Sequence, residues 1–517
     1  MATRSSLSVL LLALLLAVTG CAGSDALFRA DFEGRHALDA WSGDAGRLEP
    51  GYRRTTSLLV EQVEPGGHAS RRIELPAEQI AGKLVTLSAA VRAEGVAKPP
   101  KPWNGIKVML VLETEHGRQH PQLPLGIGTF DWMRVSRTMR IPGAVRKATL
   151  VLGLEATSGK AWFDDIELRV GRQARGGRRQ KTMFKGHDLP RLRGVMHGPR
   201  FDEKNIRDLA AWGANQVRWQ LNWTPMKKAE TWAQDLDRYD EWLDGALADA
   251  DKAIDACERH GIRVLLDLHC PPGGRAEGGV CRMFSEAKYR DKFLAIWDRL
   301  ARRYKGRDAI YAYDLINEPV EPPRGAIVTW PELAVEATRR IRAIDPGKPV
   351  VFEPGPWGGC AGFDDLVPLD LPRVIYSFHM YQPHQFTHQG VHGSKVGVAY
   401  PGIIAGEMWD KGRLREAMRP AIDFQREFNV AIYVGEFSAI RWAPDNSAYR
   451  YLRDVIDLFE EQGWDWSYHA FREWPGWSVE HTTDPKDWNP SPTPTDREQL
   501  LRKWFGQNAR PEAERTP

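Results

Sequence analysis

The sequence predicts a multidomain protein in which an all-β sandwich is followed by an α/β barrel of the (β/α)8, or TIM, type. A chain of 517 residues is longer than one ordinary domain and predicts two or three. Between residues 26 and 170, short apolar runs alternate with turn residues, and no helical period is visible. After residue 190, strand and helix patterns alternate, which is typical of a parallel sheet covered by helices.

The first 20 residues have the pattern of an export signal. Arg4 precedes an almost continuous apolar stretch over residues 7–18, which is too short for an ordinary membrane span. The segment Val18-Thr19-Gly20-Cys21 resembles a bacterial lipobox, in which the cysteine is lipidated; a cleaved signal with an incidental cysteine is the alternative. We therefore predict a lipoprotein signal peptide over residues 1–20. Lipid at Cys21 would hold the exported protein to a membrane, at the periplasmic face or the cell surface, without spanning it.

Residues 26–170 are expected to form the β-sandwich. The candidate strands are 72–75, 84–91, 106–112, 133–141, 148–154 and 161–170. Residues 31–33 and 162–168 resemble the first and last strands of jelly-roll carbohydrate-binding modules. Such sandwiches also serve as inert spacers, so carbohydrate binding and a spacer role both remain open.

Aromatic and acidic residues of the sandwich are its candidate ligand groups. Trp103 and Trp132 would stack on sugar rings, because an indole offers a large flat apolar face. Asp31 and Asp164 would suit a structural calcium ion, although paired acids are more often plain surface residues.

A basic linker is expected between the two domains. Residues 171–190 begin with a stretch rich in arginine and glycine and poor in apolar side chains. The net charge of the whole chain is +3, which argues neither for nor against nucleic acid. We expect no nucleic-acid partner.

The barrel is predicted over residues 191–505. The expected strands are 192–196, 216–219, 262–268, 311–318, 350–352, 374–379, 431–436 and 466–471. The expected helices are 206–212, 243–257, 293–300, 330–346, 414–428 and 449–459. Gly213 and Gly261 are expected to end the first two helices, and Thr329 with Glu332 to form a capping box.

Polar and aromatic side chains, most of them titratable, recur at the carboxyl ends of the expected barrel strands, where such barrels place their chemistry. These side chains are Arg218 on strand two, His269 after strand three, Asn317 and Glu318 on strand four, His379 and Tyr381 on and after strand six, Glu436 on strand seven and Trp474 after strand eight. Each one alone has an ordinary structural explanation. Together on one rim they predict a catalytic site.

Two glutamates, Glu318 and Glu436, are expected to face each other across the barrel mouth. Paired carboxylates suit glycoside hydrolysis, in which one protonates the leaving oxygen and the other attacks the anomeric carbon. Arg218 would keep Glu436 charged and lower its pKa. Asn317 can donate to a sugar hydroxyl, and Tyr381 can donate to the nucleophile.

Residues 191 to about 505 resemble glycoside hydrolase family 5, the cellulase-like family of clan A. The resemblance rests on Arg218, His269, Asn317-Glu318-Pro319, His379-x-Tyr381 and Glu436, in that order. It implies a retaining mechanism with Glu318 as acid/base and Glu436 as nucleophile, and it implies no metal or organic cofactor. A carboxylate separation of about 5 Å is expected, because about 6.5 Å or more would indicate inversion.

The aromatic platform after strand eight departs from the family pattern, since it comes late in this chain. Trp474 is the candidate, with Phe471 or Trp477 as alternatives. Four further tryptophans follow strands and are candidates for stacking on additional sugar units: Trp219, Trp223, Trp357 and Trp442.

The expected substrate is a β-linked polysaccharide or oligosaccharide, and an endoglucanase or cellulase is the leading hypothesis. A β-mannanase or an exo-β-glucanase of the same family is the alternative within the enzyme class. A non-catalytic carbohydrate-binding surface lipoprotein is the alternative from another class. A metal-dependent barrel hydrolase is disfavoured because no His-x-His ends strand one.

Cys270 and Cys281 bracket a loop rich in proline and glycine. In an oxidising compartment a disulfide between them is a plausible expectation. A zinc site is disfavoured, since the spacing fits no zinc pattern well.

Overall fold

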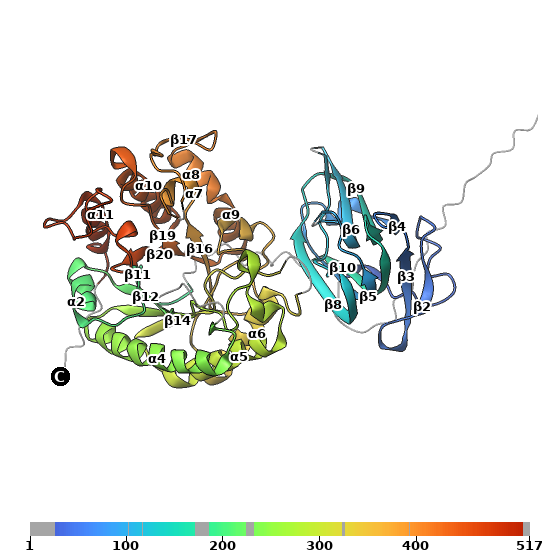
Figure 1. Cartoon of the computed structure of the whole chain (residues 1–517), viewed down its shortest axis with the longest axis horizontal. Helices are drawn as coiled ribbons and strands as arrows, with labels where there is room; N and C mark the ends of the chain where they lie inside the picture. Colours follow the sequence, from blue (N-terminus) through green and yellow to red (C-terminus); the bar gives the residue numbers. More distant parts are fainter. Residues whose placement is uncertain are drawn as a thin grey trace, which may run out of the picture.

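The computed structural model describes residues 26–101, 103–115, 117–170, 186–223, 232–322, 326–391 and 393–509. The expected signal peptide, Cys21 and residues 171–185 of the expected linker lie outside these residues, so those predictions stay predictions. An all-β unit and a barrel surrounded by helices are visible in Figure 1. Among the helices of the described part, none is long and apolar enough to cross a membrane.

The N-terminal unit consists of two antiparallel sheets. Its strands are β1 (Ala26–Ala30), β2 (Arg47–Pro50), β3 (Thr56–Gln62), β4 (His68–Leu75), β5 (Leu84–Val96), β6 (Gly105–Thr114), β7 (Gly117–Gln119), β8 (Gly128–Arg140), β9 (Val145–Glu155) and β10 (Gly159–Val170). One sheet has the order β2-β3-β10-β5-β8, with β1 on β10, and the other has the order β4-β9-β6-β7. Two short helices, η1 (Tyr52–Arg54) and α1 (Ala77–Ile80), connect strands.

Alternation along the strands builds the core between these sheets. In β5, Val85, Leu87 and Val91 are buried inward, and in β9, Leu150 and Leu152 belong to the same cluster. The period of two places every second side chain on the inner face of each antiparallel sheet.

The two aspartates of the expected calcium site each accept hydrogen bonds from nearby residues. Asp164 accepts hydrogen bonds from Tyr52 N and Thr55 Oγ1, which ties it to the turn before β3. Asp31 accepts from the backbone of Glu33. Among the described residues, neither aspartate belongs to a cluster with the spacing of metal ligands.

The second unit is a closed parallel barrel. Its strands, in order, are β11 (Arg193–His197), β12 (Gln216–Gln220), β13 (Arg263–Asp267), β14 (Ile310–Asp314), β15 (Val350–Phe352), β16 (Val374–Met380), β19 (Ala431–Phe437) and β20 (Asp465–Phe471). All eight expected strands are therefore present. Strand four ends at Asp314 rather than reaching Glu318, so Asn317 and Glu318 lie on the loop that follows it.

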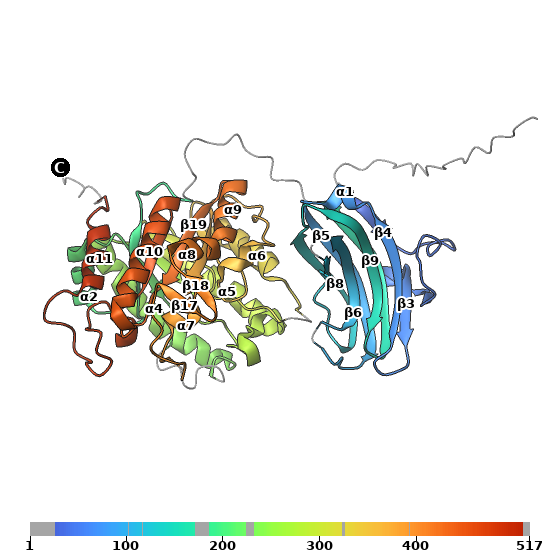
Figure 2. The ribbon, with the colours of Figure 1, turned by 90° about the horizontal axis from the view of Figure 1, so that it is seen from above.

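Helices surround the barrel, as Figures 1 and 2 show. They are α2 (Glu203–Trp212), α4 (Leu236–Arg259), α5 (Ala287–Tyr304), α6 (Trp330–Ile344), α8 (Lys411–Ala417), α9 (Arg419–Phe428), α10 (Ser447–Gln462) and α11 (Asp496–Phe505). The loop after strand six carries α7 (His384–Thr387) and a hairpin of β17 (Gly402–Ile404) and β18 (Glu407–Trp409). Short 3-10 turns are η3 (Glu277–Gly279), η4 (Arg282–Phe284), η5 (Cys360–Phe363), η6 (Pro444–Asn446) and η7 (Pro475–Trp477).

Helix boundaries follow the expected signals, with one correction. Gly213 takes a left-handed conformation after α2, with φ 90°, and Thr329 and Glu332 form the capping box of α6. The single helix expected over 414–428 is wrong, because α8 ends at Ala417 and α9 begins at Arg419. Pro420 lacks a backbone N–H and therefore interrupts the hydrogen-bond ladder there.

Apolar side chains fill the lower part of the barrel interior. Leu265, Ala312, Val351, Ile375 and Tyr433, each from a different strand, form one buried cluster. This packed layer supports the polar residues that lie closer to the carboxyl ends of the strands.

Strand β8 of the N-terminal unit contacts the barrel through ion pairs. Arg140 Nη2 lies 2.7 Å from Glu427 Oε2, and Arg137 Nη2 lies 3.3 Å from Asp365 Oδ2. Such half-exposed pairs each contribute about 0–1 kcal/mol, so they orient the two units more than they bind them together.

Candidate active site

Arg218 is the centre of a buried ionic network at the barrel mouth. It points from β12 into the barrel, and its side chain is fully buried. Its guanidinium donates to Glu436 Oε1 at 2.7 Å, Asp314 Oδ2 at 2.9 Å, Glu353 Oε1 at 3.0 Å and Asn317 Oδ1 at 3.1 Å. One planar donor therefore fixes the orientation of both Glu436 and the amide that precedes Glu318.

One of the acidic side chains around Arg218 has a raised pKa. Burial, together with the neighbouring acids Glu353 and Asp267, raises the pKa of Asp314 well above its ordinary value despite the opposing charge of Arg218. Asp314 therefore holds its proton more strongly than an exposed aspartate does.

Glu318 and Glu436 face each other as expected. One oxygen of each carboxylate and a ring nitrogen of His379 all lie within 4.8 Å of one another. This spacing agrees with the expected separation and is close to the roughly 5–5.5 Å of retaining glycosidases, whereas inverting enzymes need about 6.5–9.5 Å. The Glu318 side chain is 25% exposed and that of Glu436 only 6%, so Glu318 is the more accessible of the two.

The backbone of Glu318 is held in an uncommon conformation. Its φ is 48°, in the left-handed region that non-glycine residues rarely adopt. Its N–H donates to Glu353 Oε2 at 2.7 Å, and Arg275 donates to the carbonyl oxygens of Asn317 and Glu318, both at 2.9 Å. These charged partners stabilise the strained turn that aims Glu318 into the mouth.

Glu436 lies in a strongly positive environment. Burial alone would raise its pKa, but the charges of His379, His469 and Arg218 outweigh burial and bring the pKa well below the ordinary value. Tyr381 donates its hydroxyl to Glu436 Oε2 at 3.0 Å. Glu436 is therefore ionised and oriented, which is the state a nucleophile requires.

His379 links two glutamates through its two ring nitrogens. Nδ1 lies 2.9 Å from Glu318 Oε1, and Nε2 lies 3.1 Å from Glu353 Oε1. Burial lowers the pKa of His379, but Glu353 and Glu436 raise it by more, so the pKa lies well above its ordinary value. When the ring is protonated, Nδ1 carries a proton that faces Glu318 and Nε2 carries one that faces Glu353.

The trio Glu318, His379 and Glu436 is the group of possible metal ligands found among the described residues. Within this trio, Glu436 accepts from Arg218, and the two ring nitrogens of His379 face Glu318 and Glu353.

A second histidine, His469 on β20, stands beside the other glutamate. Its Nδ1 lies 3.5 Å from Glu436 Oε2, and its Nε2 lies 3.6 Å from Glu473 Oε2. Gln220 donates to the same oxygen of Glu473 at 2.6 Å. His269 is farther along the rim, where its Nδ1 lies 2.8 Å from Asp267 Oδ2.

Sequence reasoning missed Glu353, His469 and Glu473. Glu353 directly follows β15. His469 lies within β20, two residues before its end, and Glu473 comes two residues after β20. The strand-end rule that selected the other residues, applied to strands five and eight, would have found all three.

The aromatic platform is placed differently from the expectation. Trp474 packs edge-on against Trp442 and Trp477, at 6.0 and 5.1 Å between ring centres. Trp477 is the indole that reaches the site, because its ring stacks on Tyr381 at 6.0 Å and lies 5.0 Å from His469. The other alternative, Phe471, is buried in the core.

The four further tryptophans divide by exposure. Trp219 is buried and stacks on His197, and Trp223 packs within a group of aromatic rings on and near α4. Trp357 is 46% exposed and carries Arg275 over its ring at 5.2 Å. Trp357 is therefore the one of the four that combines exposure with a direct link to the loop of Glu318.

The expected disulfide is not formed. Cys270 and Cys281 are both free, buried thiols. The Cys270 thiol donates to Asn222 Oδ1 at 3.1 Å, and Cys281 is packed in the barrel's apolar core. Arg275 instead closes this loop by donating to Gly279 O at 3.1 Å.

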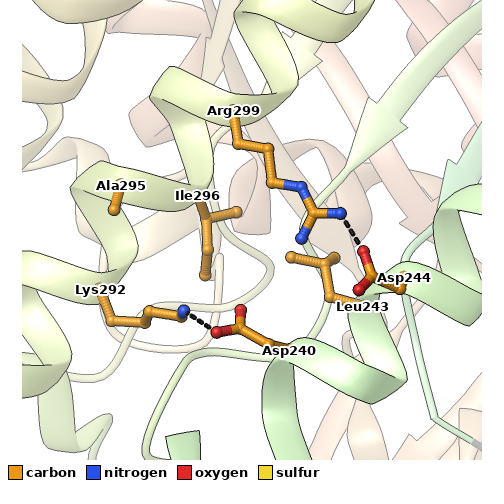
Figure 3. Close-up of a pocket in the computed structure, with 7 residues that line it drawn as sticks. All are labelled: Asp240, Leu243, Asp244, Lys292, Ala295, Ile296 and Arg299. Carbon is orange, nitrogen blue, oxygen red and sulfur yellow. Dashed lines mark hydrogen bonds and ion pairs between the residues drawn. The ribbon is translucent and has the colours of Figure 1, made fainter. Parts of the chain in front are cut away.

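The hollow drawn in Figure 3 lies elsewhere, on the outer wall between α4 and α5. It measures about 430 Å³, and ion pairs of Lys292 with Asp240 and of Arg299 with Asp244 cross it. It contains none of the rim residues described above, so it is separate from the candidate site.

Comparison with known proteins agrees with this geometry. The family model "Cellulase (glycosyl hydrolase family 5)" matches residues 179–473. "Endoglucanase C" of Acetivibrio thermocellus is 28% identical over 295 residues, covering 52% of this chain and 83% of that protein. "Cellodextrinase A" of Ruminococcus flavefaciens is 25% identical over 287 residues, covering 53% and 79%.

Solved structures include endoglucanase Cel5A from Thermotoga maritima, at 24% identity and a TM-score of 0.46, covering 60% of this chain and 96% of that one. The family model spans more than half of the present chain. This chain is thus a cellulase-like glycoside hydrolase and belongs to glycosyl hydrolase family 5.

Proposed function

We propose that the protein is a retaining endoglucanase that cleaves β-linked glucose chains by double displacement. The observation that carries this proposal is the carboxylate pair. An oxygen of Glu318 lies within 4.8 Å of an oxygen of Glu436, and Arg218 binds Glu436 but not the carboxylate of Glu318. This arrangement gives two chemically different carboxylates at a spacing that leaves no room for a water between Glu436 and the sugar.

In the first step, Glu436 attacks the anomeric carbon and Glu318 gives its proton to the leaving oxygen. A covalent glycosyl-enzyme forms as the glycosidic bond breaks. In the second step, Glu318 removes a proton from water, and that water displaces Glu436 from the same carbon. Asn317 turns its carbonyl oxygen to Arg218, so its amide N–H groups are the atoms that can donate to a sugar hydroxyl.

The names of relatives support glucose polymers as the substrate class, since they include "Endoglucanase C" and "Cellodextrinase A". A β-mannanase or an exo-β-glucanase remains the alternative. The test is a product profile on carboxymethyl-cellulose, mixed-linkage glucan, laminarin and mannan. Oligosaccharides released from a β-glucan support the proposal, monosaccharide alone would mean an exo enzyme, and release from mannan alone would replace glucose by mannose.

We further propose that the enzyme is exported and anchored through lipid on Cys21. The signal-like residues 1–20 and the lipobox-like segment before Cys21 support this. Cys21→Ser should move the enzyme from the membrane fraction to the soluble fraction of expressing cells. An unchanged distribution would contradict lipid anchoring.

A carbohydrate-binding role for the all-β unit, as a jelly-roll module, is a second proposal. Trp103 supports it, because its side chain is 60% exposed on the segment before β6, whereas Trp132 packs against Tyr52. Trp103→Ala should weaken retention on insoluble cellulose while leaving hydrolysis of soluble substrates unchanged. Equal retention of both proteins would assign the unit a spacer role.

A further inference from the structure

Each of the two facing glutamates belongs to a chain of the form glutamate, histidine, glutamate. In the first chain, Glu318 contacts His379, and His379 contacts Glu353. In the second, Glu436 contacts His469, and His469 contacts Glu473. The first chain has hydrogen-bond distances of 2.9 and 3.1 Å, whereas the second has contacts of 3.5 and 3.6 Å.

Glu353 is the last member of the first chain, after Glu318 and His379, and it is the most buried of the three. Its side chain is fully buried at the end of β15. Oε1 accepts from Arg218 at 3.0 Å and faces His379 Nε2 at 3.1 Å, while Oε2 accepts from the backbone N–H of Glu318 at 2.7 Å. Two of its partners, the Arg218 guanidinium and the Glu318 N–H, are fixed donors, and an ionised carboxylate can also accept a proton held on Nε2 of His379.

We propose that Glu353 is a positioning residue: it holds the Nε2 proton of His379, so that Nδ1 of the same ring exchanges a proton with Glu318. This inference rests on the proposed acid role of Glu318. When the proton moves, the Nδ1–H bond of His379 breaks as an O–H bond forms on Glu318, and both groups become neutral. Glu318 then carries the proton that it gives to the leaving oxygen.

The geometry determines which nitrogen exchanges its proton. Nε2 is closed off by Glu353, which is buried and out of reach of substrate. Nδ1 faces Glu318, which is a quarter exposed at the mouth. A carboxylate that fixes the outer nitrogen of an imidazole sets the tautomer at the inner one, as the aspartate does in serine proteases.

Other charged groups also act on His379, and the test must separate them from Glu353. The groups that face it or its partners are Glu318, Glu353 and Glu436, with the cations Arg218 and His469. Glu473 provides the matched control, because it is the outer glutamate of the chain that ends on Glu436 instead of Glu318.

The test uses the full-length enzyme and two aryl β-cellobiosides that differ in the leaving phenol. A 2,4-dinitrophenolate leaves without protonation, whereas a phenol of ordinary acidity needs the acid. Glu353→Gln should lose at least about tenfold more kcat/KM on the second substrate than on the first, since general acid catalysis contributes about 10²–10⁴-fold. Glu473→Gln should lose kcat/KM equally on both.

A pH profile gives an independent readout of the same claim. The charge of Glu353 helps His379 keep its proton at high pH, so Glu353→Gln should move the alkaline limb of kcat/KM to lower pH. Glu353→Asp, which retains the charge, should restore the limb at least in part. Equal losses on both substrates with an unmoved limb would overturn the proposal.

Two further results keep this outcome unambiguous. Should circular dichroism show that Glu353→Gln does not fold, the wild-type enzyme still tests the proposal. NMR should then detect a His379 Nε2–H that is protected from exchange, and an unprotected Nε2–H would overturn the proposal.

Glu318→Ala is the reference for the acid itself. If that variant lacks leaving-group dependence, the acid role of Glu318 fails; if it has the dependence and Glu353→Gln does not, only the role of Glu353 fails.

Discussion

Arg218 Nη1 donates to Oε1 of Glu436 at 2.7 Å, and both side chains are almost completely removed from solvent. The same guanidinium also holds the Asn317 amide beside Glu318. The two facing glutamates are therefore positioned through one buried cation, so their proposed catalytic roles are connected to the stability of the barrel.

Removing the charge of Glu436 should stop catalysis without unfolding the protein. Glu436→Gln keeps the shape of the side chain, but an amide cannot form the glycosyl-enzyme. We expect turnover of soluble β-glucan to fall below detection, with a circular dichroism spectrum like that of the wild type. Undiminished activity in this variant would refute the nucleophile assignment.

Removing the acid should produce a graded defect. Glu318→Ala is expected to lower kcat on natural polysaccharide by about 10²–10⁴-fold, the usual contribution of a positioned acid or base. Added azide should restore turnover of an activated aryl glycoside, because a small anion can enter the space of the missing carboxylate. Initial rates with and without azide provide the measurement, and absence of rescue would count against an acid/base role.

Replacing Arg218 should affect stability and activity together. Arg218→Met leaves Glu353 and Glu436 buried without their shared cation, and breaking a buried pair in this way costs about 3–5 kcal/mol. Urea unfolding should show that loss in the free energy of unfolding. Arg340→Met is a suitable control, since its pair with Asp298 is partly exposed and should cost about 1 kcal/mol or less.

The free energy of unfolding should fall at both acid and alkaline pH. The pKa of Glu436 and that of Glu353 are lowered in the fold, chiefly by His379 acting against burial, so their contribution is complete above about pH 4.3 and is lost as the pH falls through the folded values. The pKa of His379 is raised by Glu353 and Glu436 acting against burial. Its contribution is therefore complete below about pH 6.5 and is lost as the pH rises through the folded value.

The measurement for this prediction is urea unfolding over a pH series. The wild type should show a broad maximum, with a decline on the alkaline side that His379→Gln reduces. An alkaline decline of the same size in that variant would show that His379 does not cause it.

The free thiols of Cys270 and Cys281 predict indifference to reductant. Iodoacetamide should alkylate both residues in denatured protein without prior reduction, and peptide mass mapping should find both modified. The thermal midpoint should be the same with and without dithiothreitol. A peptide pair that is linked until reduced would contradict the structure at this loop.

Particular residues show how far the sequence could predict this site. Arg218, His379, Tyr381 and Glu436 could be placed because each lies at or just after the end of an apolar strand, and the parallel barrel brings such ends together. Glu353 was missed although it obeys the same rule, since strand five is only three residues long and is followed by Pro354 and Gly355.

Side-chain direction could not be predicted from the chain alone. The platform expected at Trp474 is reached by Trp477 instead, because the turn after β20 determines which indole points to Tyr381. The prediction of a disulfide between Cys270 and Cys281 is wrong for a similar reason. A spacing in sequence cannot show that the Cys270 thiol turns to Asn222.

The anomeric configuration of the first product tests the central claim most directly. Proton NMR of a soluble cello-oligosaccharide digest, recorded within minutes of adding enzyme, distinguishes the β-anomer from the α-anomer before they equilibrate. A pair of carboxylates with oxygens within 4.8 Å predicts that the β-anomer accumulates first. Initial accumulation of the α-anomer would mean inversion, and it would contradict the roles given to Glu318 and Glu436.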